Sequence, residues 1–176
     1  MLVIYTGAFI PNKGIRLLLD AIPLVCERYP EAHFVIAGFP LDQIAEYPGQ
    51  DIFKTRATII SPLSYFELSK ILRMSDIGVD PKESSTRQAS GKMLQYMGAG
   101  LPIVCFDTQN NREYLGDGGT YAREAIPKGL ADAIGELMAS VSMREEKGAL
   151  NRKRAAMFSW EKSAEMLEKI YSSLIE

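Results

Sequence analysis

The chain is organised around the stretch Ser90 to Val104, SGKMLQYMGAGLPIV. Its pattern predicts a helix that ends at the Gly-Ala-Gly turn and a buried strand at 102–105. A helix start carries unpaired N–H groups and a positive dipole end, so it binds anions where no bulky side chain blocks the approach. Ser90 and Gly91 leave that approach open, and Lys92 adds charge. The same residues also fit an ordinary helix cap, so the stretch alone leaves both interpretations open.

Outside this stretch, short apolar runs alternate with segments of helical periodicity. The runs lie at 2–7, 33–38, 57–60, 77–80 and 102–105, with a weaker one at 118–121. Runs that are apolar without alternation predict a parallel sheet covered on both faces. We therefore expect an α/β fold, a doubly wound, Rossmann-like parallel sheet of about six strands in three αβα layers, with a helical C-terminus. Ligands bind such sheets at the carboxyl ends of the strands.

Several local signals refine the helices. Pro23 should kink or break the first helix, and residues 40–47 should form a short one before a turn at 48–51. Capping boxes are expected at 64–67 and 142–145, and Ser159 should cap the last helix. The apolar stripe of that helix predicts core packing; its members are Trp160, Ala164, Leu167, Tyr171 and Leu174.

Composition limits the classes of function. The 176 residues are 47% hydrophobic, which suffices for one core and suggests one domain. A net charge of −2 with mixed signs does not predict nucleic-acid binding. Cys26 and Cys105 lack the spacing of a metal or disulfide motif, which fits a cytoplasmic protein, and no run predicts a signal peptide or membrane span. His33, the single histidine, stands at a strand entry without a triad partner, so we expect a strand residue rather than a catalyst.

Lys13 and the segment 83–92 fall on the same edge of the predicted sheet. Lys13 follows the first strand where the first helix begins, which suits either a solvated lysine or one that reaches a phosphate. Because two weak signals meet at one edge, the sequence favours an anion pocket over simple capping.

The motifs together resemble a known family. They are YTGAF at 5–9, NKG at 12–14, the stretch quoted above, the segment 107–115 and FSWEKSAEMLEKIY at 158–171. The chain resembles the nucleotide-sugar-binding C-terminal domain of the family 4, or group 1, glycosyltransferases, which have two Rossmann-like domains in the GT-B architecture. Residues 1–176 would then be one donor-binding domain, with the N-terminal acceptor domain absent.

The resemblance implies a retaining enzyme of hexosyltransferase type in polysaccharide biosynthesis. Its donor would be a UDP- or GDP-sugar, its acceptor a glycan or lipid-linked sugar, and no metal or other cofactor would be required. Contact with the inner face of the membrane would come through the absent half. The isolated domain should bind donor without turnover.

The resemblance also implies site residues. Lys13 would clamp the diphosphate and act in catalysis. Arg87 stands where the family has its first motif glutamate and would act in catalysis by neutralising the diphosphate, or Glu83 would serve in its place. Gln95 replaces the carboxylate that commonly holds the ribose, and Ala8 replaces a second cation. The remaining donor-binding residues would be Gly7, Gly14, Ser61, Ser90, Gly91 and Lys92, with the base held by backbone near 38–40 and 61–63.

These departures keep a second function open, a non-catalytic nucleotide-sugar-binding or regulatory module. A flavodoxin-like or receiver-like signalling domain is disfavoured, because no acidic cluster follows the first strand.

Overall fold

A computed structural model describes residues 1–45, 50–82 and 90–175. Within these residues, six parallel strands form one sheet in the order β3-β2-β1-β4-β5-β6. The strands are β1 (Leu2–Ala8), β2 (His33–Phe39), β3 (Ala57–Ile60), β4 (Ile77–Asp80), β5 (Ile103–Phe106) and β6 (Gly119–Ala122). The strand order runs outward from β1 in one direction and from β4 in the other. The topological switch point therefore lies between the carboxyl ends of β1 and β4, where such sheets bind ligands.

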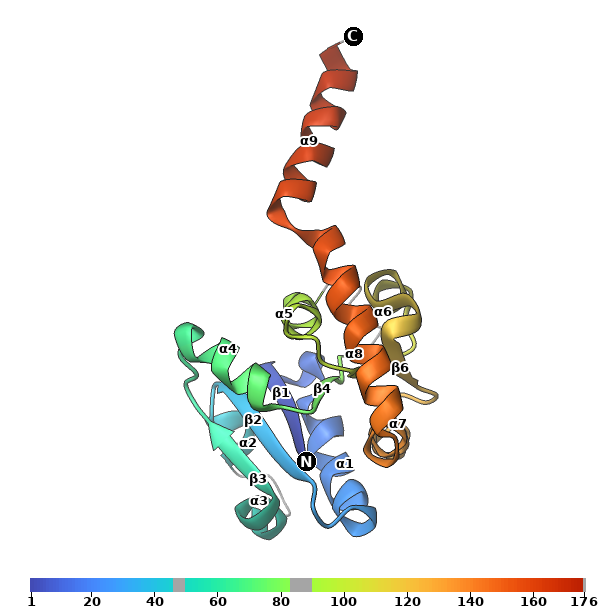
Figure 1. The fold of residues 1–176 in the computed structure, drawn as a ribbon. Helices are drawn as coiled ribbons and strands as arrows, with labels where there is room; N and C mark the ends of the chain where they lie inside the picture. Colours follow the sequence, from blue (N-terminus) through green and yellow to red (C-terminus); the bar gives the residue numbers. More distant parts are fainter. Residues whose placement is uncertain (46–49, 83–89, 176) are drawn as a thin grey trace.

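Helices cover both faces of the sheet (Figure 1). Alternate strand residues enter different cores, since Val3 and Tyr5 belong to one and Ile4 to the other. The first core includes α1 (Ile15–Arg28) and α7 (Pro127–Ala139), and the second includes α4 (Tyr65–Met74) and α5 (Gly91–Ala99). The remaining elements are η1 (Pro11–Lys13), α2 (Asp42–Ala45), α3 (Gln50–Arg56), α6 (Gln109–Leu115), η3 (Gly116–Gly118), α8 (Val141–Ala155), η4 (Ala156–Phe158) and α9 (Trp160–Ile175). The predicted doubly wound sheet is confirmed.

Three predictions about the early helices need correction. Helix α1 runs from Ile15 to Arg28, so Pro23 does not break it, and the alternative, a kink at Pro23, stays a prediction. Pro23 lies on the exposed side of α1, and the helix continues past it although the carbonyl of Leu19 loses its usual N–H partner. Residues 50 and 51, predicted as part of a turn, belong to α3, and the predicted short helix extends over 42–45 in the described residues.

The predicted caps are only partly correct. Ser64 precedes α4, but its side chain makes no cap hydrogen bond within the described residues, and its carbonyl oxygen instead accepts from Glu67 N at 3.0 Å. Helix α8 is capped two residues earlier than predicted, because Ser140 Oγ accepts from Met143 N at 3.2 Å. The cap at Ser159 is confirmed by its bond from Lys162 N at 3.2 Å.

The last helix departs most from prediction. Figure 1 shows α9 leading away from the sheet, and its apolar residues are exposed rather than packed in a core. Trp160 is 88% exposed and Leu174 is 76% exposed. The 3.6-residue periodicity was sufficient to predict a helix with one apolar side, but the described residues of the sheet and its helices do not extend far enough to cover it.

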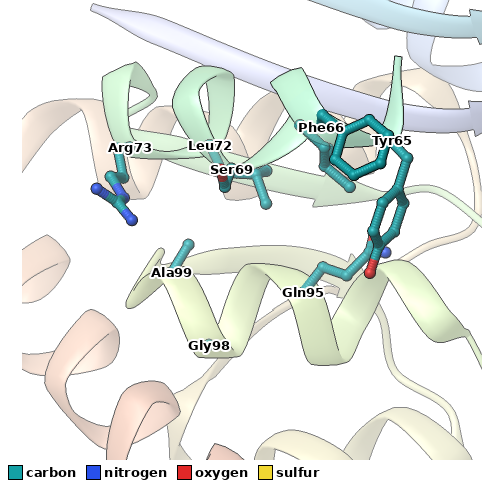
Figure 2. A pocket seen from close by; sticks show the side chains of 9 residues that line it. Tyr65, Phe66, Ser69, Leu72, Arg73, Gln95, Gly98 and Ala99 are labelled. Atoms are coloured by element: carbon teal, nitrogen blue, oxygen red, sulfur yellow. The ribbon is translucent and has the colours of Figure 1, made fainter. Parts of the chain in front are cut away.

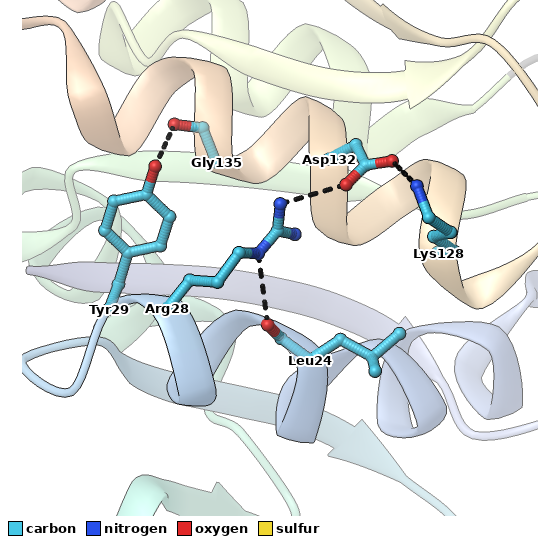
Figure 3. Close-up of polar contacts among 6 residues, drawn as sticks. All are labelled: Leu24, Arg28, Tyr29, Lys128, Asp132 and Gly135. Atoms are coloured by element: carbon cyan, nitrogen blue, oxygen red, sulfur yellow. Dashed lines mark hydrogen bonds and ion pairs between the residues drawn. The ribbon is translucent and has the colours of Figure 1, made fainter.

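Polar contacts join α1 to α7 across the first core (Figure 3). Arg28 and Lys128 both contact the carboxylate of Asp132, at 2.9 and 2.6 Å, and Tyr29 Oη donates to Gly135 O at 3.0 Å. The Lys128 hydrogen bond, followed by that of Arg28, lowers the pKa of Asp132. These side chains are partly exposed, so their attraction is screened by water.

We expect Asp132→Asn to lower the free energy of unfolding by less than about 1 kcal/mol, as is typical of exposed ion pairs. The loss should be full above the pH at which an unfolded aspartate titrates, about pH 4, and should vanish as pH falls through the lower pKa of the folded carboxyl group. Urea denaturation of both proteins over this pH range measures it. A constant difference at every pH would contradict the assignment to charge.

Candidate active site

A pocket of about 380 Å³ lies at the carboxyl ends of β1 and β2, beside the start of α5. We call it the strand-end pocket. It contains six of the residues predicted to bind donor: Gly7, Lys13, Ser90, Gly91, Lys92 and Gln95. Its other lining residues are Thr6, Ala8, Ala37, Gly38, Phe39, Leu63, Tyr65 and Leu68. Lys13 and the start of α5, about eighty residues apart, therefore share one pocket.

The turn before α1 holds Lys13 at this edge. Gly14 adopts a left-handed conformation with φ 71° and donates to Pro11 O at 2.9 Å, which ends η1 directly after Lys13. A Cβ on Gly14 would lie 1.8 Å from Pro81 O, so the turn sits directly against the backbone that follows β4. Gly14 thus positions Lys13, although Gly14 itself does not line the pocket.

Among the described residues, no side chain caps the start of α5. Ser90 occupies the N-cap position, yet its side chain makes no cap hydrogen bond to any described residue. A Cβ on Gly91 would meet no described atom within 4 Å. At the other end of the helix, Gly100 adopts φ 76° and Leu101 N donates to Tyr96 O at 3.0 Å. The predicted helix stop is therefore confirmed. At the helix start Met93 N donates to the Ser90 carbonyl oxygen at 3.0 Å, while the Ser90 side chain accepts from no described N–H group.

Lys92 lies deeper than a lysine at a helix start usually does. Its side chain is 10% exposed, and its Nζ lies 3.4 Å from Asp80 Oδ1 and 3.8 Å from the centroid of the Tyr5 ring. A Cβ on Gly7 would come within 3.2 Å of this Nζ, so a glycine at position 7 leaves room for the ammonium group. Burial lowers the pKa of Lys92, and the neighbouring Asp80 opposes that shift.

Sequence reasoning missed two charged residues beside Lys92. Asp80, the last residue of β4, has no exposed surface, and Lys82 is 6% exposed. Burial, followed by the charge of Lys13, lowers the pKa of Lys82. A carboxylate inside an otherwise apolar strand was the signal that could have revealed this cluster.

Tyr96 ties α5 to β1 below the pocket. Its Oη accepts from Thr6 N at 2.7 Å and lies 3.2 Å from Thr6 Oγ1. Burial raises the pKa of Tyr96, so its hydroxyl remains neutral and able to hydrogen-bond. These contacts fix the position of α5 relative to the end of β1.

A groove of about 430 Å³ between α4 and α5 adjoins the strand-end pocket (Figure 2). Gln95, Tyr65 and Leu68 line both cavities, and Figure 2 shows Tyr65 and Gln95 at one end with Arg73 at the other. Tyr65 is 77% exposed and Phe66 is 86% exposed. The sequence did not identify these aromatic residues, because the groove joins helices separated by sixteen residues of chain.

Of the residues expected to hold the base, Gly38, Phe39 and Leu63 also line the pocket, whereas Pro40, Ser61 and Pro62 do not. Ser61 follows β3 directly but does not line the cavity, and Ala8 lines it without supplying a charge. Arg87 and Glu83 lie outside the described residues. His33 stands at the amino end of β2, half-buried, with Nε2 2.8 Å from Thr58 Oγ1, as expected of a strand residue. Among the described residues, no group of His, Cys, Asp or Glu has the arrangement of a metal site.

A family model described as "Glycosyl transferases group 1" matches residues 1–140. The chain belongs to this family. The spore coat protein SA of Bacillus subtilis (strain 168) is 28% identical, over 97% of this chain and 48% of its own length. The D-inositol 3-phosphate glycosyltransferase of Corynebacterium urealyticum is 27% identical, over 97% and 42% respectively. This group 1 glycosyltransferase chain thus spans less than half the length of these curated relatives.

Solved structures support the same fold. A mutant of S. aureus TarM, crystallised with fondaparinux, alpha-GlcNAc-glycerol and UDP, matches with a TM-score of 0.80 at 20% identity. The match covers 97% of this chain and 34% of that one. The GT-B fold expected from the sequence motifs is confirmed. None of the helices in the described part of this group 1 glycosyltransferase chain has the length and hydropathy to cross a bilayer.

Proposed function

We propose that the strand-end pocket binds the nucleoside-diphosphate sugar donor of a retaining glycosyltransferase. The observation that carries the proposal is that Lys13 and the start of α5 line one cavity at the carboxyl ends of β1 and β2. Anions bind such helix starts, and the topology makes this edge the usual ligand site. The UDP in the TarM complex and the glycosyltransferase named among the relatives support a nucleotide-sugar, with UDP- and GDP-sugars as the candidates.

In this proposal the diphosphate lies against the first N–H groups of α5, with Lys13 on its other side. Gln95 would hydrogen-bond a ribose hydroxyl, and the apolar end of the pocket, at Leu63 and Tyr65, would take the base. The positive charges and helix dipole would stabilise the negative charge that develops on the leaving nucleoside diphosphate. Arg87, predicted from the sequence to add to this charge, stays a prediction. No metal is required for these steps.

The acceptor, a glycan or lipid-linked sugar, would bind between this domain and an N-terminal acceptor domain of the same protein. The length of the curated relatives supports such a partner, since this chain spans less than half of each. The exposed apolar side of α9 offers a surface that a further domain could cover. The isolated chain should therefore bind donor without transferring sugar.

A second candidate is a nucleotide-sugar-binding module without catalysis. Two residues of the pocket favour it: Ala8 supplies no cation, and Gln95 supplies no carboxylate. Transfer activity of the full-length protein separates the two candidates, because a binding module would bind donor and transfer none.

A thermal-shift screen with UDP, GDP, UDP-glucose and GDP-mannose tests the proposal. A ligand that binds the native state raises Tm with its concentration. We expect at least one nucleotide to raise Tm in a dose-dependent way and calorimetry to give a single site. If none of the four changes Tm and calorimetry detects no heat of binding, the proposed function is wrong.

A further inference from the structure

The pair of Asp80 and Lys92 is unusual for a core. Asp80 has no exposed surface and lies 3.4 Å from the Lys92 ammonium group. Among the residues that the structure describes, neither carboxylate oxygen of Asp80 nor Lys92 Nζ has a hydrogen-bond partner. Desolvating two charges is costly unless further partners compensate, so packing alone does not account for this pair. A buried, incompletely paired ammonium group that lines a pocket suits an anionic ligand that completes its contacts.

Charged and titratable groups face Lys92 from each neighbouring element. Tyr5 on β1 presents its ring, Lys13 comes from η1, and Lys82 and Asp80 come from the end of β4. Burial and the two other lysines lower the pKa of Lys92, whereas Asp80 raises it. Three ammonium groups and one carboxylate leave an excess of positive charge beside the start of α5. That excess suits a diphosphate.

We propose that Asp80 is a positioning residue, whose buried carboxylate keeps the Lys92 ammonium group in place and charged so that Lys92 and Lys13, which both line the pocket, act together on the donor diphosphate. This inference rests on the proposed function. The Asp80 carboxylate itself repels the diphosphate. It strengthens binding overall because it keeps Lys92, which lies closer to the ligand than Asp80 does, positively charged. The two effects have opposite signs, which makes them separable by experiment.

Without Asp80, the opposing lysines and burial would remove the proton from Lys92 as pH rises. The Asp80→Asn protein should therefore bind diphosphate increasingly weakly toward alkaline pH. The probes are UDP-glucose and GDP-mannose, because their diphosphate charge does not change between about pH 6 and about pH 9. Calorimetric titration at each of these two pH values gives Kd. A comparison of buffers with different ionisation enthalpies gives the protons taken up on binding.

We expect the ratio of the Asp80→Asn Kd to the wild-type Kd to rise about tenfold from the lower to the higher pH. A tenfold change corresponds to the free energy of one hydrogen bond to a charged group. Proton uptake by the variant should appear at the alkaline limit. The control Glu168→Gln removes one negative charge from an exposed site on α9 and should leave the ratio at about one at both pH values. A ratio that does not change with pH would mean that Asp80 has a structural role only. Tighter binding by Asp80→Asn at every pH would mean that Asp80 only repels the diphosphate. Either result overturns the inference.

The second comparison introduces Asp80→Asn into the Lys92→Met protein. In a protein without the Lys92 ammonium group, the only remaining effect of the Asp80 carboxylate is to repel the anionic ligand. Asp80→Asn should therefore tighten binding in this protein at both pH values. The double variant also removes both charges of the buried pair, which favours folding if Asp80→Asn alone does not fold. The double variant should bind about tenfold more weakly than wild type at about pH 6. If it binds as tightly as wild type, the pair contributes nothing and the inference is wrong.

The same titrations distinguish failure of the donor site from failure of the role of Asp80. If wild type binds neither nucleotide-sugar, the proposed function fails and the role of Asp80 fails with it. If wild type binds and the variants follow one of the contradicting patterns, only the role of Asp80 is lost.

Discussion

Replacing Gly14 with alanine is expected to lower the free energy of unfolding by about 3 kcal/mol, from steric overlap and backbone strain together. Gly14 has φ 71°, where a side chain is strained, and a Cβ there would lie 1.8 Å from the carbonyl oxygen of Pro81. That oxygen belongs to the backbone and cannot rotate away. Chemical denaturation of wild type and variant measures the difference.

Gly98→Ala is the matched control. Gly98 lies within α5, and a Cβ added to it would meet no described atom within 4 Å. Because alanine is the better helix former, this variant should be more stable than wild type by about 0.5–1 kcal/mol. If Gly14→Ala were as stable as its control, the close approach of η1 to the end of β4 would be wrong, and with it the placement of Lys13.

Replacing Lys13 with methionine is expected to weaken binding of UDP-glucose or GDP-mannose, whichever wild type prefers, about 30-fold, or about 2 kcal/mol. Lys13 lines the strand-end pocket together with the start of α5, so its loss removes one charge-assisted contact to the diphosphate. Methionine preserves most of the length of the side chain. Calorimetric titration gives both Kd values at the same ionic strength, which must be fixed because salt screens this interaction.

Lys169→Met makes the same change at an exposed position of α9 and should leave Kd unchanged. The melting temperature of Lys13→Met without ligand should stay close to that of wild type, which separates lost binding from lost folding. An unchanged Kd for Lys13→Met would remove Lys13 from the diphosphate site.

Much of the fold could be predicted because burial leaves a direct mark on the sequence. The uninterrupted apolar runs predicted the parallel strands, and Gly100 predicted the end of α5. Ser-x-x-Glu at 64–67 did not produce a side-chain cap, since the motif fixes which groups are available but not the conformation that joins them. The apolar side of α9 shows a similar limit. Amphipathicity indicates that one side can be covered, while the sequence does not say by what.

The site could be predicted at the level of the pocket rather than of its atoms. Lys13 and Gly91 meet because strand-end loops share one edge of a parallel sheet, which topology alone dictates. The direction of the Lys92 side chain, toward Asp80 and the Tyr5 ring, depends on packing that no local pattern encodes. Tyr65 was missed for the same reason, because its place beside Gln95 arises from the contact of two helices.

A crystal structure of the chain with bound UDP or GDP shows directly whether the strand-end pocket holds the diphosphate. We expect the diphosphate to accept hydrogen bonds from the first N–H groups of α5 and from Lys13 Nζ, within the strand-end pocket. A diphosphate bound elsewhere, with Lys13 and Gly91 both out of hydrogen-bond reach, would contradict the proposed donor site.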